Sequence, residues 1–164
     1  MLEVLKIPED RLSVLIGKKG SVKHVIEQYT KTRLRISDTV KITGEDPLGV
    51  LTARKMITAI GRGFSPEVAE RLADENCDIH VISLHDYSPK KRERLLGRVI
   101  GRRRRSLNII EKETGASIVV KGKTVAIIGA PDELGPAEDA VVELLGGSTH
   151  SHAFRAMDRK REKS

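Results

Sequence analysis

The sequence predicts an α+β fold that is built twice, with the element order β-α-α-β-β-α in each copy. Three observations predict it: an internal repeat, strand and helix periodicities in the same order in both copies, and a globular composition. Of the 164 residues, 38% are hydrophobic and 32% are charged, proportions typical of folded proteins. A chain of this length forms one medium domain or two small ones, and the repeat favours two.

The internal repeat is carried by the segment LSVLIGKKG (12–20), which recurs as LGRVIGRRR (96–104), 84 positions further along the chain. Apolar residues and glycines stay in register beyond this segment, with one inserted residue after the first strand of the hairpin. A chance match would not hold its register for so long, so we interpret the chain as a tandem of two similar units. The aligned pairs include Leu12/Leu96, Leu15/Val99, Ile16/Ile100, Gly17/Gly101, Val25/Ile109, Ile26/Ile110, Glu27/Glu111, Thr30/Thr114, Leu34/Ile118, Ile36/Val120, Thr39/Thr124 and Gly44/Gly129.

Periodicity assigns the elements within each unit. Alternation predicts opening strands at 2–7 and 77–84, and two-strand hairpins at 33–43 and 117–128. Helical spacing predicts a short helix, a glycine-bearing loop, a second helix and a longer closing helix, which together back a three-stranded sheet. The apolar faces of the closing helices comprise Ala53, Met56, Ile57 and Ile60 in the first unit and Ala137, Ala140, Val141 and Leu144 in the second.

These elements predict four segments along the chain. We expect a first domain over 1–64, a short helical linker over 65–75, a second domain over 76–147, and a basic C-terminal helix or tail over 148–164. Ser65 suits an N-cap and Pro66 a first helical position, so a short helix is expected in the linker. The C-terminal segment is either a docked helix or a tail that becomes ordered only on binding.

The loop between the first two helices, Gly17-Lys18-Lys19-Gly20, is the strongest functional signal. Glycines allow close backbone approach, and the helix that starts there offers free N–H groups and a positive dipole end to an anion. A Walker-type nucleotide loop would need a glycine at position 12, which is Leu12, and a preceding strand instead of a helix. A tight turn with solvated lysines and a clamp for about four RNA nucleotides remain as interpretations.

The element order with Ile16-Gly17-Lys18-Lys19-Gly20 between the helices resembles a type I KH domain. The resemblance implies that single-stranded RNA lies in a groove beside this loop, with its bases resting largely on aliphatic side chains. That mode of binding agrees with a chain that has two Tyr, two Phe and no Trp. The candidate floor consists of Leu15, Ile16, Val22, Leu34 and Ile36, although Leu15 and Val22 also suit an ordinary core.

The second copy departs from this motif, because Arg104 stands where the closing glycine belongs. The substitution puts close backbone approach and the usual groove geometry in question. Arginine side chains offer bidentate contacts to phosphate instead, so we expect a phosphate-contacting patch there. The residues predicted to bind RNA are Ile16, Gly17, Lys18, Lys19, Gly20, Ser21, Lys23, Arg33 and Arg35 in the first unit, Arg98, Gly101, Arg102, Arg103, Arg104 and Arg105 in the second, and Arg159 and Lys160 near the end of the chain.

The whole chain resembles a narrower family, the archaeal Dim-two-like proteins, which are relatives of the eukaryotic KRR and partner-of-NOB assembly factors. The segments that carry this resemblance are AIGRGFSP (59–66), KTVAIIG (123–129) and the basic ending from His150 to Arg161. The resemblance implies binding near the 3′ end of small-subunit ribosomal RNA during its maturation. It also implies contact with the maturation nuclease and with the alpha subunit of initiation factor two.

Composition limits the other classes of function. The formal net charge is +7, which favours a nucleic-acid partner, and no apolar run approaches the length of a membrane span. Cys77 is the only cysteine, and the start of the chain does not resemble a signal peptide, so we expect a cytoplasmic protein. His80, His85, His150 and His152 lack the partners of a metal site or catalytic centre. We therefore expect a non-enzymatic monomer without cofactor or metal. Two functions remain as alternatives to rRNA maturation: a scaffold for assembly or initiation factors, and a messenger-RNA-binding translational regulator.

Overall fold

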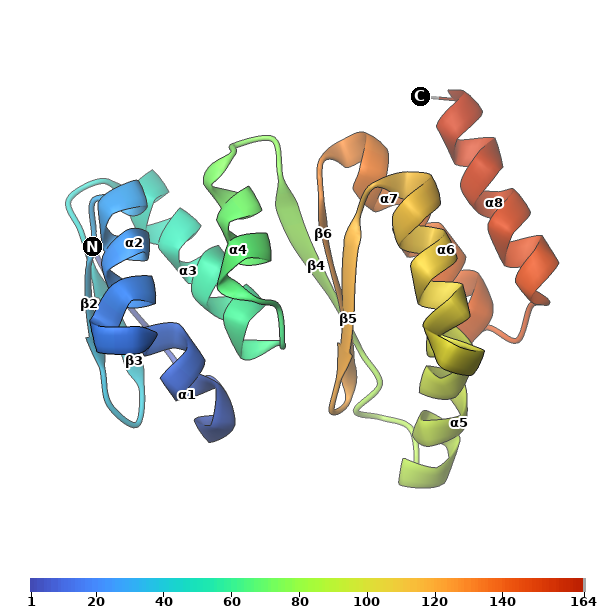
Figure 1. The fold of residues 1–164 in the computed structure, drawn as a ribbon, viewed down its shortest axis with the longest axis horizontal. Helices are drawn as coiled ribbons and strands as arrows, with labels where there is room; N and C mark the ends of the chain where they lie inside the picture. The colour runs from blue at the N-terminus through green and yellow to red at the C-terminus, as the bar shows by residue number, and fades with distance from the viewer. Residues whose placement is uncertain (164) are drawn as a thin grey trace. The chain divides into compact units, whose positions relative to one another are not determined.

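The computed structural model describes residues 1–163, with side chains through Asp158, and divides the chain into two units, Met1–Glu75 and Asn76–Ser164. Each unit has the predicted element order, and in each the helices cover one face of a three-stranded antiparallel sheet (Figure 1). The α+β architecture predicted from the repeat is confirmed. The first unit includes the predicted linker and the second includes the predicted tail.

The first unit has strand order β1-β3-β2, so β2 is an edge strand. Helices α1 and α2 are joined by the glycine loop, and a short helix α4, continued by a 3₁₀ turn at Glu70–Ala73, packs on α3. The elements are β1 (Leu2–Leu5), α1 (Glu9–Ile16), α2 (Ser21–Thr30), β2 (Arg33–Ile36), β3 (Val40–Thr43), α3 (Pro47–Gly61) and α4 (Pro66–Ala69).

The second unit repeats this arrangement with strand order β4-β6-β5. Its first helix is one turn longer than that of the first unit, 12 residues against 8. The elements are β4 (Asp78–Ser83), α5 (Pro89–Ile100), α6 (Arg105–Thr114), β5 (Ser117–Lys121), β6 (Thr124–Gly129), α7 (Pro131–Leu145) and α8 (His150–Lys163).

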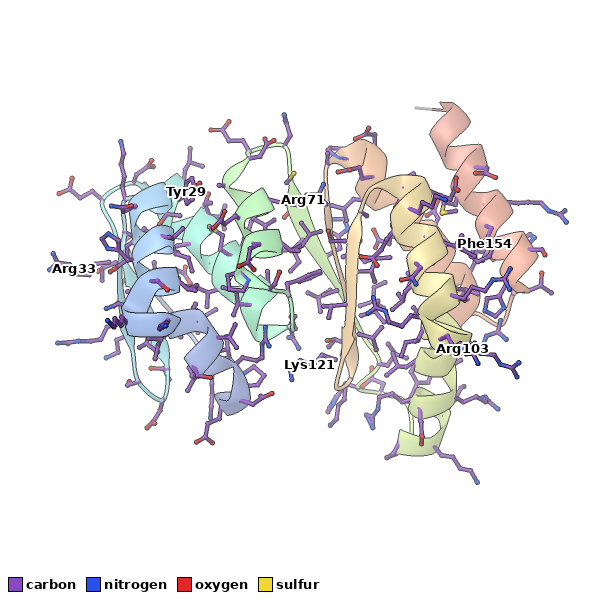
Figure 2. The ribbon with its side chains drawn as sticks, viewed as in Figure 1. Tyr29, Arg33, Arg71, Arg103, Lys121 and Phe154 are labelled. Atoms are coloured by element: carbon purple, nitrogen blue, oxygen red, sulfur yellow. The ribbon has the colours of Figure 1, made fainter. Side chains whose placement is uncertain are left out.

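The alternation of the hairpin sequence sets which side chains enter the core of the first unit. Leu34 of β2 and Ile42 of β3 are buried, while Arg33, labelled in Figure 2, is exposed on the other face of the sheet. Arg35, two residues further along β2, is exposed on the same face as Arg33. Leu15 of α1 is completely buried, which contributes about 2 kcal/mol for a side chain of this size. Leu15 is therefore a core residue and not part of an RNA-facing floor.

A glutamate ties the second helix of each unit to its edge strand. The Leu34 N–H of β2 donates to Glu27 Oε2 at 2.9 Å, and the Ile118 N–H of β5 donates to Glu111 Oε2 at 3.1 Å. These bonds satisfy N–H groups that would otherwise have no partner at the sheet edge. They hold α2 beside β2, and α6 beside β5, at a fixed distance.

The repeat extends further than its sequence shows, because α4 and α8 occupy equivalent positions after α3 and α7. The Ser65 hydroxyl accepts the Val68 N–H at 3.3 Å, and the Thr149 hydroxyl accepts the His152 N–H at 3.1 Å. Each cap is followed by a completely buried alanine, Ala69 or Ala153. The predicted linker and the predicted tail are therefore the same structural element, short in the first unit and long in the second.

Candidate nucleic-acid interface

The loop of the first unit has a backbone that only a glycine tolerates at its start. Gly17 has φ 75° and ψ 176°, and a Cβ there would lie 2.6 Å from Val22 Cγ2 and 2.7 Å from the Val22 backbone nitrogen. Gly20 is also left-handed, with φ 77° and ψ 17°, but a Cβ there would meet no atom within 4 Å. Gly17 is therefore required by packing, whereas Gly20 leaves open space above the backbone.

The start of α2 lies at this open space. Gly20 is the N-cap of α2 and provides no side-chain hydrogen bond to the first turn, so the free N–H groups of the helix can receive an anion. Lys18, Lys19 and Ser21 are exposed beside them, and Ile16 is 38% exposed at the end of α1. The predicted loop residues thus come together as a candidate phosphate cradle with an apolar neighbour.

A cavity of about 510 Å³ lies along α2 and β2 and continues over the outer face of the sheet. It brings together Lys23 of α2 with Arg33 and Arg35 of β2, three residues that the sequence predicts to bind RNA. Only Ile36 of the predicted aliphatic floor is partly accessible here, because Leu34 is 2% exposed. The lining comprises Leu2, Lys23, Glu27, Arg33, Leu34, Arg35, Ile36, Lys41 and Thr43.

Lys41 lines this candidate site as well, although it was not predicted from the sequence. It lies directly opposite Arg35 in the β2–β3 register and is exposed on the same face. Two like charges in opposed positions destabilise a sheet, and a bound phosphate would offset their repulsion. The hairpin register contained the signal, because pairing Ile36 with Val40 places Arg35 against Lys41.

The loop of the second unit keeps the same backbone without its closing glycine. Gly101 has φ 74° and ψ 170°, and Arg104 has φ 61° and ψ 19°, close to the values of Gly17 and Gly20. A Cβ on Gly101 would lie 2.8 Å from the Ser106 backbone nitrogen. The loop backbone is therefore the same in both domains, and Arg104 differs from Gly20 in the side chain that it adds to the surface.

Arg98 has a structural role that the sequence did not indicate. Its Nε donates to the Leu144 carbonyl at 3.0 Å and its Nη2 donates to the Ser148 carbonyl, both at the end of α7. In the first unit Arg11 donates at 2.8 Å to the equivalent carbonyls of Ile60 and Phe64. Each unit thus uses one arginine to cap the C-terminus of its closing helix.

The other arginines of the second loop are on the surface. Arg104 lies 3.6 Å from Glu111, and Arg102, Arg103 and Arg105 are exposed and have no ion-pair partner among the side chains described. Arg102 and Arg105 line a second cavity together with Arg98. The side chains of Arg159 and Lys160 lie outside the described residues, so their role stays a prediction.

The remaining candidates for chemistry stay apart. In the part of the chain that the structure describes, no three His, Cys, Asp or Glu side chains are placed to hold a metal ion. His80 and His152 each contact a single glutamate, Glu138 and Glu143. None of the described helices is long and apolar enough to cross a membrane.

A β-α-α-β-β-α unit with a G-x-x-G loop between its first two helices defines a type I KH domain. Residues 2–59 match the family model of the KH domain, and residues 78–162 match the model of the eukaryotic type KH-domain (KH-domain type I). The chain belongs to the KH-domain family and contains two such domains.

Close relatives come from archaea. A KH domain-containing protein of Methanocaldococcus jannaschii is 44% identical over 170 residues, which cover 99% of this chain and 75% of the relative. The crystal structure of Dim2p from Pyrococcus horikoshii has 46% identity and a TM-score of 0.88, covering 97% of this chain and 99% of that one. An a/eIF2alpha–aDim2p–rRNA complex from the same organism matches with 45% identity and a TM-score of 0.90, covering 100% and 96%.

A structure of a protein of unknown function from Aeropyrum pernix has 30% identity and a TM-score of 0.93, covering 99% of this chain and 92% of that one. The resemblance to the archaeal Dim-two-like proteins is confirmed by these matches.

Proposed function

We propose that this protein binds single-stranded RNA through the groove of its first KH domain and acts in maturation of the small ribosomal subunit, near the 3′ end of its rRNA. The observation that carries the proposal is the intact cradle at Gly17–Gly20 beside a basic cavity. The rRNA in the complex of the similar Pyrococcus protein supports the class of ligand. A cytoplasmic location is part of the proposal.

In this mechanism the loop holds the RNA backbone and the groove holds the bases. About four nucleotides fit such a groove. Phosphates approach the N–H groups at the start of α2, where Gly20 leaves room and Lys18 and Lys19 supply positive charge. Bases lie against Ile16 and Ile36, while Arg33 and Arg35 neutralise the backbone on the far side of the edge strand.

The second domain contributes through side chains. Arg104 fills the space that Gly20 leaves open, so a phosphate meets the guanidinium groups of Arg102, Arg103 and Arg105 before it meets the backbone. Linking two sites in one chain raises the overall affinity, since the second site binds at a high effective concentration.

The first test replaces Gly20 by Asp, which adds a negative charge at the cradle. Since a Cβ at this position meets no atom within 4 Å and Asp tolerates the left-handed backbone better than most residues, we expect the domain to fold. We expect the affinity for a single-stranded RNA from the 3′ end of small-subunit rRNA to fall at least about tenfold, because attraction of a phosphate is replaced by repulsion. Fluorescence anisotropy with a labelled RNA measures the change.

The matched control is Gly147→Asp, a positive-φ glycine with equally open surroundings in the turn after α7. It adds the same charge and comparable backbone strain outside the groove. Equal affinities of the two variants would show that the groove of the first domain does not bind the RNA.

The second test addresses the arginine loop. Charge reversal by Arg103→Glu removes an exposed guanidinium without an ion-pair partner among the described residues. Log affinity decreases as log salt concentration rises, and the magnitude of this slope should decrease by about one for each RNA phosphate that the variant no longer neutralises. Lys112→Glu, on the exposed side of α6, makes the same charge change away from the loop, and equal slopes in both variants would refute binding of phosphate by the loop.

The cellular target is the most informative observation. Crosslinking in cells followed by sequencing should recover fragments from the 3′ end of small-subunit rRNA. Recovery of messenger RNA fragments in their place would identify a translational regulator.

A second candidate function is a scaffold for assembly or initiation factors. The matching complex contains a/eIF2alpha, which favours contact with the alpha subunit of initiation factor two; the maturation nuclease is the other expected partner. Affinity capture after nuclease treatment separates the two functions. Partners that stay bound without RNA favour the scaffold, and partners released with the RNA favour the RNA-binding function.

A further inference from the structure

The geometry points to a second ligand site in this protein: a cleft between α5, α6 and α8 of the second domain that holds one nucleotide, its phosphate by arginines and its base by Phe154. The site lies on the α8 side of the arginine loop, whereas a KH groove lies toward the edge strand. The inference rests on the RNA-binding function proposed above for the source of its ligand.

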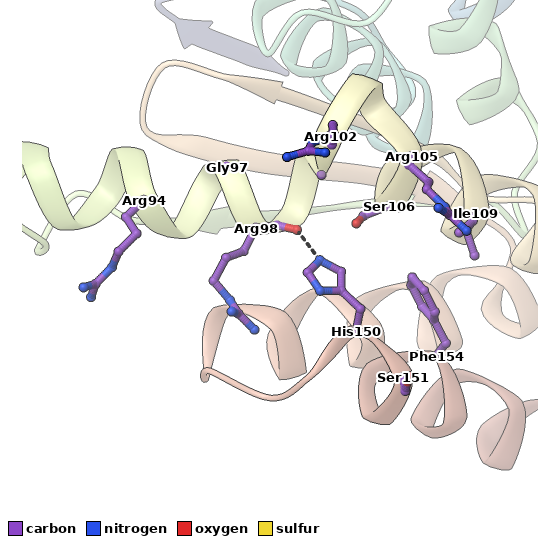
Figure 3. Close-up of a pocket in the computed structure, with 11 residues that line it drawn as sticks. Arg94, Gly97, Arg98, Arg102, Arg105, Ser106, Ile109, His150, Ser151 and Phe154 are labelled. Atoms are coloured by element: carbon purple, nitrogen blue, oxygen red, sulfur yellow. Dashed lines mark hydrogen bonds between the residues drawn. The ribbon is translucent and has the colours of Figure 1, made fainter.

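The cleft is large enough for a nucleotide and is strongly basic. Its volume is about 610 Å³, within the range of about 300–1,000 Å³ typical of small-molecule sites. Among the described residues, four arginines and no carboxylate line it (Figure 3). The lining comprises Arg94, Gly97, Arg98, Gly101, Arg102, Arg105, Ser106, Ile109, His150, Ser151 and Phe154.

Three of these arginines are available to a ligand. Arg98 is committed to the carbonyls at the end of α7, but Arg94, Arg102 and Arg105 are exposed and lack ion-pair partners among the described side chains. A phosphate group would neutralise such an unpaired guanidinium charge and accept bidentate hydrogen bonds from it.

The wall formed by α8 supplies an aromatic surface. Phe154 is half-buried and lies edge-to-face with His150, with 6.2 Å between ring centroids and 63° between ring planes. His150 is itself fixed, since its Nε2 lies 3.2 Å from the Arg98 carbonyl oxygen (Figure 3). An ordered aromatic ring beside guanidinium groups is the combination with which proteins stack an unpaired base.

Gly97 is an independent indication of a ligand. It lies inside α5, where glycine is unfavourable for helix formation. A Cβ at Gly97 would meet no protein atom within 4 Å, so packing does not explain the glycine. Its missing side chain leaves the cleft open to a group that approaches the α5 backbone.

The surface beside α4 in the first domain differs from the surface beside α8 in its charge. A space of about 180 Å³ lies there between α2, α3 and α4, without a contribution from α1. Pro66, Glu67 and Glu70 lie there at the positions of His150, Ser151 and Phe154. Two carboxylates repel a phosphate, so the surface beside α4 does not offer the basic site that we infer beside α8.

The test uses the absence of tryptophan from the sequence. Phe154→Trp places a single tryptophan in the cleft of the full-length protein. A base that stacks on the ring quenches its emission, so we expect quenching that saturates on addition of the 3′-end rRNA oligonucleotide. Tyr87→Trp, exposed in the loop before α5, is the control and should show no saturable quenching. Saturated RNA binding by anisotropy without quenching in the Phe154→Trp protein would overturn the proposal.

The source of the nucleotide is resolved by adding AMP and CMP, and separately inorganic phosphate, to the Phe154→Trp protein. Quenching by a mononucleotide identifies a site for free nucleotides, and quenching by RNA alone identifies a nucleotide of the RNA chain. Both results support the site. Absence of quenching with every probe overturns it.

A second variant fills the cleft without removing a charge. Gly97→Leu extends a side chain into the open space and improves helix propensity, so the domain should keep or raise its melting temperature while the Phe154→Trp quenching falls at least about fivefold. Undiminished quenching would show that the ligand does not approach α5. Gly20→Asp tests the groove of the first domain alone. RNA binding without quenching would therefore reject the cleft and leave the groove proposal intact, whereas absence of RNA binding by the unsubstituted protein would reject both proposals.

Discussion

The loops of the two domains have different sequences and nearly the same backbone. Gly20 and Arg104 both adopt left-handed conformations, and Gly17 and Gly101 differ by 1° in φ and 6° in ψ. The first glycine and the residues packed against it therefore determine the backbone path of the loop. The closing residue adopts the same left-handed conformation whether it is glycine or arginine. What the closing position changes is the surface: open backbone in one domain, a guanidinium group in the other.

The helix caps show the same separation between geometry and sequence. Arg11 and Arg98 bind equivalent carbonyls at the ends of α3 and α7, but they do not occupy equivalent positions in α1 and α5. Arg98 is at the position of Val14, nearly one turn further along. The two domains therefore share the contact, but an arginine at a different position of the first helix makes it in each.

The largest effect is expected at the first glycine of each loop. Gly17→Ala and Gly101→Ala place a Cβ against Val22 or Ser106 in a backbone region that is essentially restricted to glycine. Each should destabilise its own domain by about 3 kcal/mol. Hydrogen exchange resolved by domain measures the loss, since the two domains need not unfold together.

Gly20→Ala is the control for this pair. It has a positive φ but no clash, so its cost should stay within about 1 kcal/mol. If Gly101→Ala were as mild as Gly20→Ala, the shared loop geometry would be wrong for the second domain.

A smaller effect is expected from the capping arginines. Arg11→Ala and Arg98→Ala each leave two carbonyls at a helix end without their charged donor, at a cost of about 2 kcal/mol. Arg98→Lys should recover only part of it, because an ammonium group cannot reproduce the fork of the guanidinium. Chemical denaturation followed by domain-resolved hydrogen exchange compares the variants.

Arg94→Ala controls for the loss of a cation on the same helix. Arg94 is exposed and has no ion-pair partner among the described residues, so its removal should change stability by less than about 0.5 kcal/mol. A loss equal to that of Arg98→Ala would show that net charge, and not the cap, stabilises the domain.

The sequence predicted the elements well because each has a regular physical signature. Alternation located both hairpins, and the Ser65–Pro66 pair located the start of α4. The first-domain loop was found because two glycines flank two lysines. These signals are local, so a single sequence contains them in full.

What the sequence did not reveal depends on contacts between distant segments. The equivalence of α4 and α8 rests on a shared cap and a buried alanine, Ala69 or Ala153, while the surrounding residues differ. The binding of Arg98 to Leu144 joins residues 46 positions apart, and Arg94 and Phe154, which line the same cleft, are 60 positions apart. Charge alone predicted the arginine patch and could not separate its structural member from the exposed ones.

The smallest effect tests whether the two closing residues are interchangeable. Arg104→Gly relieves a left-handed conformation that costs an ordinary residue about 1.5 kcal/mol. Against that gain, the greater flexibility of glycine in the unfolded chain costs about 0.5 kcal/mol, and loss of the exposed Arg104–Glu111 pair at 3.6 Å costs about 0.5 kcal/mol. The net expectation is a stabilisation of about 0.5 kcal/mol in the second domain.

Gly20→Arg is the reciprocal change and should destabilise the first domain by a similar amount, because the left-handed strain that it introduces exceeds the stabilisation from an exposed ion pair with Glu27, the counterpart of Glu111. Domain-resolved hydrogen exchange measures both variants. Opposite signs would confirm that the loop backbone is common to the two domains and tolerates either residue. A loss of more than about 1 kcal/mol in Arg104→Gly would show that the ion pair with Glu111 holds the second loop in place, and the two loops would then share a shape for different reasons.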